Sequence, residues 1–156
     1  VAVMLSCNGI VQNIAKELPV PPVMSYFFVT AGMFLKNNNT FAQKGFHTIG
    51  SLKTNRLLYP SEMKKKLSEL AAELSTTHNG FDLVTVNKRK YYVYRYKGNL
   101  NGIENAVVLL SYPEKAFGNP KALRAFISTN VDLSTQEILR ISITLSYWNC
   151  RFLAVA

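Results

Sequence analysis

The sequence predicts an α/β domain that is interrupted by an antiparallel β-meander. A strand, a helix and a second strand fit between Val23 and Leu52, which is the length of one βαβ unit with a parallel strand pair. From Phe81 onward the apolar residues recur at every second position instead of at helical spacing. A meander that lies between parts of an α/β domain indicates an insertion.

The first unit is predicted from two apolar runs. Val23–Val29 and Phe46–Leu52 are rich in apolar and aromatic residues and are expected to be buried strands. Between them, Lys36–Lys44 is typical of a helix, and Gly45 follows where a left-handed cap is expected. The two strands should therefore be parallel neighbours.

A second helix is predicted to begin at Ser61 and to run through SEMKKKLSELAAEL. Its apolar residues recur at helical spacing: Met63, Leu67, Leu70 and Leu74. The three lysines Lys64–Lys66 then mostly face away from the apolar side.

The segment after the linker Thr76–Gly80 alternates as a half-buried sheet does. It predicts three antiparallel strands joined by the turn Asn87–Arg89 and the loop Gly98–Gly102, and a fourth strand after the loop Pro113–Pro120: Asp82–Val86, Lys90–Tyr96, Ala106–Tyr112 and Ala122–Thr129. The pattern Ser134-Thr135-Gln136-Glu137 is a capping box and predicts that a helix begins there.

Positive charge is concentrated in the middle of the chain. The 156 residues carry 18 Lys and Arg against 9 Asp and Glu, a net charge of +9. Lys44–Lys97 holds eleven of these cations and four of the acids, so +7 of the +9 lies in this segment. Patchy positive charge favours polyanionic partners. A charge run can also be no more than a solvated surface.

Two basic blocks contain the candidate DNA-binding residues. Lys53 and Arg56 follow the strand Phe46–Leu52, which would hold these cations in place before a phosphate arrives. The other candidates lie on the second helix and the meander: Lys64, Lys65, Lys88, Arg89, Lys90, Arg95 and Lys97. These residues predict contact with phosphates and no readout of base sequence.

Tyrosines alternate with the cations of the second block. Tyr92, Tyr94 and Tyr96 share one face of the predicted strand, and Tyr91 shares the other face with Arg95. Stacking on bases is one interpretation. For at least two of these tyrosines we favour a place in the sheet core.

Patterns for catalysis and metal binding are weak. The chain has no GxSxG, P-loop or GxGxxG motif, and His47 lies within a predicted strand, where a structural role is expected. Asp82 and Asp132 are the only aspartates and the glutamates are scattered, so no metal site is predicted. Cys7 and Cys150 lie far apart in the sequence, as in a reduced cytoplasmic protein.

Neither end of the chain predicts a membrane segment. The first residues lack the basic region of a signal peptide. The apolar tail Ile141–Ala156 is too short and too polar to span a bilayer. Because the sequence begins at Val1 and its first residues are typical of a domain interior, we expect a fragment.

Long ordered strings occur in the chain: KGFHTIGSLKTNRLLYP, then the Lys-rich helix, then DLVTVNKRKYYVYRYKGNLNGIENAVVLLSYPEKAFGNPKALRAFISTNVDLSTQEIL. From about Phe41 to Leu139 the chain resembles the catalytic region of bacterial insertion-sequence transposases of the DDE superfamily. The resemblance implies a partial ribonuclease H-like α/β core over 1–75, a β-rich insertion over 76–130, and a C-terminal helix with a divergent apolar tail over 131–156. It also implies DNA transposition, in which the intact family cuts DNA with Mg²⁺ held by Asp, Asp and Glu.

The catalytic positions depart from the family pattern. The first Asp belongs to a strand upstream of Val1, and Thr30 stands in the place of the second. In the Tyr-x2-Arg-x3-Glu pattern the chain has Ser142, Leu145 and Asn149. Neutral Thr and Asn side chains cannot supply the charge that a Mg²⁺ pair needs. The resemblance therefore predicts a truncated or frameshifted copy without catalytic acids and without a bound metal.

Three functional interpretations remain open. The chain is an inert fragment of a DDE transposase, or a non-catalytic nucleic-acid-binding module that uses its basic surfaces, or a chain without function that folds poorly. DNA is the expected partner in the first two, and no membrane partner is expected. The missing upstream strand would leave an open sheet edge beside Val23–Val29, which predicts self-association.

Overall fold

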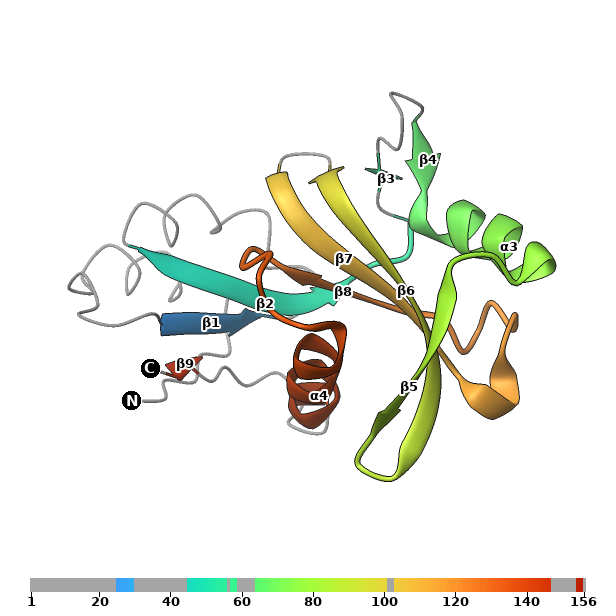
Figure 1. The fold of residues 1–156 in the computed structure, drawn as a ribbon. Coiled ribbons are helices and arrows are strands. Elements are labelled where there is room, and N and C mark those ends of the chain that lie inside the picture. Colours follow the sequence, from blue (N-terminus) through green and yellow to red (C-terminus); the bar gives the residue numbers. More distant parts are fainter. Residues whose placement is uncertain are drawn as a thin grey trace.

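The computed structural model describes residues 25–29, 45–55, 57–58, 64–100, 103–146 and 154–155. Within these ranges one sheet (Figure 1) is formed by nine strands: β1 (Ser25–Val29), β2 (Phe46–Leu52), β3 (Leu57–Leu58), β4 (Lys65–Lys66), β5 (Phe81–Val86), β6 (Arg89–Leu100), β7 (Ile103–Pro113), β8 (Arg124–Ser128) and β9 (Ala154–Val155). The strand order is β4-β3-β6-β7-β8-β2-β1-β9, and β5 pairs with β6 beside this path. The described part of the chain is mixed α/β and mostly sheet.

The first two strands confirm the predicted parallel pair. β1 and β2 run side by side in parallel, with Phe28 opposite Ile49. Such a pair needs a crossover connection. Gly45 has a φ of 82°, which is the left-handed conformation expected of a cap. The predicted helix Lys36–Lys44 lies outside the described residues.

The meander is also confirmed. β5, β6, β7 and β8 are antiparallel neighbours in chain order. Asn87 and Lys88 both have positive φ, 50° and 65°, as in a two-residue hairpin turn whose twist matches that of the strands. β6 is longer than predicted and shifts its register between Gly98 and Leu100. After β7 the chain forms a 3₁₀ turn, η2 (Glu114–Ala116).

β8 joins the meander to the parallel pair. It pairs with β7 on one side and with β2 on the other, where Ser128 lies opposite Ile49. The sheet is therefore continuous between the predicted core of 1–75 and the predicted insertion of 76–130, and the domain boundaries themselves stay a prediction.

The second predicted helix begins later than expected. Lys65 and Lys66 form β4, which pairs with β3, and α3 (Leu67–Thr77) starts after them. The helical prediction is therefore wrong for these two lysines, because a strand pairing with Leu57 and Leu58 overrides the local helical pattern. Glu69 completes the helix start by accepting the backbone N–H of Lys66 at 3.2 Å.

α4 (Thr135–Ser146) begins at the predicted capping box. The Ser134 hydroxyl accepts the backbone N–H of Glu137 at 3.1 Å, and the Glu137 carboxylate accepts the N–H of Ser134 at 3.1 Å. No helix among the described residues has the length and apolar character needed to cross a bilayer.

The two helices cover opposite sets of strand residues. In β7, Ala106, Val108 and Leu110 belong to the core that contains Leu67 and Leu70 of α3. The intervening residues Val107 and Leu109 belong to the core that contains α4 residues. Because both faces of β7 are buried, its sequence is a continuous apolar run instead of an alternating one.

The edge beside β1 is not open over its whole length. Ala154 and Val155, which form β9, pair antiparallel with Phe27 and Tyr26. The expectation of an open edge is therefore wrong at Tyr26 and Phe27, because β9 pairs with them. The premise on which we predicted self-association is weakened accordingly.

Candidate nucleic-acid interface

Two neighbouring hollows in the surface share the residues Arg89, Tyr91 and Pro113. The first has a volume of about 480 Å³ and is lined also by Lys88, Lys90, Glu114 and Lys115. The second, of about 690 Å³, extends to the end of β2 and to β8. We call the two hollows together the basic furrow.

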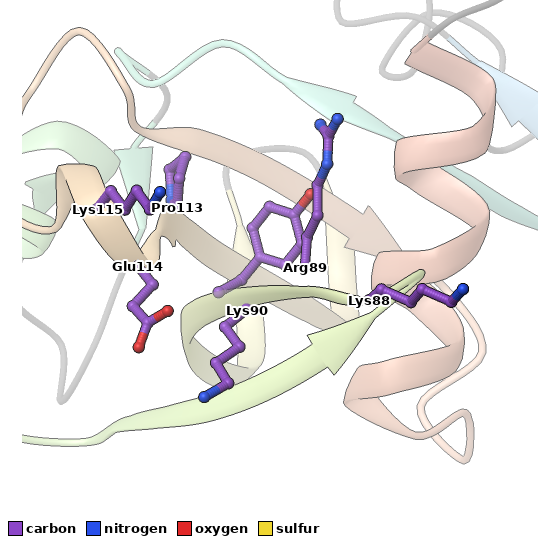
Figure 2. A pocket seen from close by; sticks show the side chains of 7 residues that line it. Lys88, Arg89, Lys90, Pro113, Glu114 and Lys115 are labelled. Carbon is purple, nitrogen blue, oxygen red and sulfur yellow. The ribbon is translucent and has the colours of Figure 1, made fainter.

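The cations of the first hollow come from the β5–β6 hairpin and from η2. Three consecutive exposed cations lie at the tight turn of Asn87 and Lys88 and directly after it: Lys88, Arg89 and Lys90. Figure 2 shows these side chains leaving the turn in different directions. Lys115 and Glu114 lie on the opposite wall (Figure 2). Four cations and one carboxylate give this hollow a net positive charge.

The second hollow has a different lining. Its described wall contains Arg89 and Arg124, the hydroxyls of Ser51, Thr54 and Ser111, and several apolar side chains. The guanidinium of Arg124 donates to the backbone carbonyls of Lys121 and Leu123, at 3.1 and 2.9 Å, so the backbone fixes its direction. No carboxylate appears among the described residues that line this hollow.

The furrow contains cations of the second basic block predicted from the sequence and reaches the chain beside the first. Lys53 is exposed and lines neither hollow, although its neighbours Leu52 and Thr54 both line the second. Lys88, Arg89 and Lys90 line the first. The sheet order brings the end of β2 and the hairpin to one surface, although they lie more than 30 residues apart in the chain. Arg56 lies outside the described residues.

Three other candidates lie away from the furrow walls. Lys64 and Lys97 are exposed but line neither hollow, and Lys97 stands in the β6 ladder opposite Val107. Lys65 forms an ion pair with Glu73 of α3. An exposed ion pair of this kind contributes little stability, about 0–1 kcal/mol. It does reduce the local positive charge.

Arg95 has internal partners that the sequence did not reveal. Its guanidinium donates to the carbonyl of Leu133 at 2.9 Å, the carbonyl of Val131 at 3.0 Å, and the hydroxyl of Thr135 at 3.3 Å. These three acceptors precede or begin α4. Arg95 thus has a structural contact that was not part of its prediction as a DNA-binding residue.

Most of the tyrosines belong to the core, as we favoured. Tyr94 and Tyr96 pack against the core that contains Leu67 and Leu70 of α3, and Tyr91 packs against the core that contains α4 residues. Tyr92 lies 4.6 Å from Phe117 between ring centroids. Of these four, only Tyr91 also lines the furrow among the described residues.

Sequence reasoning missed two cations of the furrow, Lys115 and Arg124. Arg124 was detectable, because it is the only charged residue of the predicted strand Ala122–Thr129. Lys115 lies in a segment predicted only as a loop, and nothing local to it indicated a site.

The catalytic positions implied by the sequence resemblance, Thr30 and Asn149, lie outside the described residues. Within the described ranges no three His, Cys, Asp or Glu side chains gather in a way that could hold a metal ion. Both aspartates are exposed; Asp82 lies in β5 and Asp132 in the turn before α4. These residues do not fit the carboxylate set that Mg²⁺ needs, and we assign no step to a metal.

Comparisons with known proteins return no relative. No family model, no curated protein and no solved structure matches the chain.

Proposed function

We propose that this chain is a fragment of a DDE-type transposase that binds DNA phosphates through the basic furrow and does not cut DNA. The observation that carries the proposal is the convergence of β2, the β5–β6 hairpin and β8 on one cationic surface. The family part rests on the sequence resemblance, and the parallel β1–β2 pair agrees with a partial ribonuclease H-like core. We place the protein in the cytoplasm.

The physical basis is the release of counterions. Lys88, Arg89 and Lys90 are exposed, and Lys115 faces them across the first hollow. For each phosphate that such a cation neutralises, the plot of log affinity against log salt concentration becomes steeper by about 0.9. Most of the furrow cations are exposed to solvent, which suits contact with the phosphate backbone of DNA.

A salt titration with duplex DNA tests the proposal. The double variant R89Q/K90Q removes two furrow cations, and K64Q/K97Q removes the same charge from positions outside both hollows. We expect the furrow variant to have a slope shallower by up to about 2. The control should keep the slope of the unchanged protein. Equal losses in both variants would mean that net charge alone attracts DNA, and undetectable binding at low salt would refute the proposal.

Catalysis needs a separate assay. We expect neither cleavage nor joining of DNA ends when the purified protein is given Mg²⁺ or Mn²⁺, because Thr30 and Asn149 are neutral. Cleavage that disappears in D82N or D132N would show that the acids are assigned incorrectly.

The alternative is a non-catalytic nucleic-acid-binding module that is not tied to transposition. The cationic surface supports this alternative equally, because contact with phosphates needs no tie to transposition. The nucleotide sequence on either side of the coding region separates the two. An Asp-bearing strand encoded upstream, and Tyr-x2-Arg-x3-Glu in another reading frame downstream, would support a transposase fragment, whereas flanks without them would favour a general module.

A further inference from the structure

Arg95 is held by one short segment of the chain. Val131, Leu133 and Thr135 lie 36 to 40 positions later in the sequence, and all three supply acceptors to the guanidinium. The side chain is half-buried. A planar guanidinium can serve several acceptors at fixed angles, which an ammonium group on a flexible stem does less well.

A second bond joins the same two parts of the fold. Gln136, in the first turn of α4, donates its side-chain amide to the carbonyl of Thr85 in β5 at 3.0 Å. Arg95 lies in β6 opposite Leu109 of β7, one residue beyond Tyr94, where the pairing of β6 with β5 ends. The N-terminal end of α4 is therefore tied to β5 near the hairpin tip by Gln136 and to β6 at the base of the hairpin by Arg95. That end is itself fixed by the bonds between Ser134 and Glu137.

Figure 1 shows β5 and β6 running together to a turn beyond the rest of the sheet, with α4 beside them. The turn carries Lys88, and Arg89 and Lys90 begin the return strand. A hairpin tip of this kind opens locally more easily than the centre of a sheet. The bonds from Arg95 and Gln136 oppose that opening.

We propose that Arg95 is a positioning residue, which locks the β5–β6 hairpin onto α4 and so holds the cations of the turn against the furrow. This inference rests on the proposed function, because it concerns the same surface. It differs from the sequence prediction, in which Arg95 contacts DNA itself. Removal of the lock lowers the fraction of molecules whose furrow is assembled, and the apparent affinity falls by that fraction.

Hydrogen exchange of the backbone amides in residues 86–92 tests the lock without DNA. R95K keeps the positive charge but loses the fork of donors, and R95Q loses both. We expect exchange at the hairpin tip to be faster in both variants, on the order of tenfold or more, because hydrogen bonds made by a charged group are lost. Q136L should show a smaller increase in the same amides. T144A is the matched control: it removes a side-chain hydrogen bond of the same helix, from the exposed Thr144 hydroxyl to the carbonyl of Arg140, and touches neither bond to the hairpin, so exchange at the tip should not change.

Salt titrations of duplex binding then separate positioning from contact. If Arg95 positions the hairpin, R95K and R95Q lose affinity by a similar factor, on the order of threefold, and keep the slope of the unchanged protein. T144A should retain the affinity of the unchanged protein. If Arg95 contacts a phosphate, R95K retains affinity and R95Q has a slope shallower by about 0.9, which would overturn the inference. The inference would also be overturned if the hairpin-tip amides of R95K exchanged no faster than those of the unchanged protein. Should the unchanged protein bind no DNA, the proposed function fails, while the exchange data still decide whether the lock exists.

Discussion

Gly80 lies against the ring of Tyr94, so closely that a Cβ atom at Gly80 would be 2.9 Å from the ring carbons Cδ2 and Cε2. Gly80 also has a φ of 77°. Gly80 lies in the connection between α3 and β5. Its contact with Tyr94 brings this connection close to the sheet.

The change Gly80→Ala should therefore destabilise the protein. A left-handed backbone costs an alanine about 1–2 kcal/mol, and displacement of the Tyr94 ring adds about 1 kcal/mol or more. Gly118 is the control, because its φ of 82° is similar but the nearest atom to a Cβ, Ser75 Oγ, is 3.9 Å away. Urea unfolding should show a larger loss for G80A than for G118A. Equal losses would mean that the ring contact is unimportant.

Thr48 presents a buried hydroxyl without a hydrogen-bond partner among the described residues. The residue is 1% exposed, and its backbone N–H already donates to Thr129 Oγ1 at 2.8 Å. Thr48→Val removes the unpaired hydroxyl and keeps the shape, so we expect a gain in unfolding free energy of up to about 1–2 kcal/mol. Thr48→Ser keeps the hydroxyl and loses a methyl group, so it should be less stable than the unchanged protein. A loss in both variants, measured by thermal unfolding, would indicate that the hydroxyl has a partner.

Tyr112 makes the stability depend on pH in the alkaline range. Burial raises the pKa of its phenol above the ordinary value of 10.0, and a hydrogen bond with Ser75 lowers it in part. Since the unfolded chain loses this proton first, stability falls as the pH rises from about 10 through the higher pKa of the folded state. Tyr112→Phe lacks this titration. Unfolding curves from pH 8 to 11 should show a smaller decline for the variant, and parallel declines would contradict the assignment.

Lys115 and Arg124 should contribute to DNA binding although the sequence did not single them out. Each lines a hollow of the furrow, and Arg124 is held in place by two backbone carbonyls. Neutralisation of either one, as K115Q or R124Q, should make the salt slope of binding shallower by about 0.9. Lys97→Gln is the comparison, because Lys97 lies outside both hollows. An unchanged slope in R124Q would remove the second hollow from the interface.

The local parts of the fold followed from the sequence, because their causes are local. The strands β5 to β8 and the capping box at Ser134 each depend on residues a few positions apart. Lys65 and Lys66 show the limit. Their helical pattern is outweighed by pairing with Leu57 and Leu58, which no periodicity encodes.

The candidate site was predictable only in part, for a similar reason. Alternation indicated on which face of β6 Arg95 lies, but its acceptors follow 36 to 40 residues later. Arg89 and Arg124 meet in one hollow only because β6, β7 and β8 are neighbours in the sheet. The basic blocks could thus be named in advance, whereas the furrow depends on tertiary structure.

The place of β8 between β7 and β2 has a consequence for how the chain is made. Ile49 finds its partner Ser128 only after 79 further residues have been synthesised, because β2 pairs with β8 across that interval. Contacts of such separation slow folding and leave a strand edge unpaired meanwhile. During synthesis one edge of β2 therefore stays unpaired until β8 has left the ribosome.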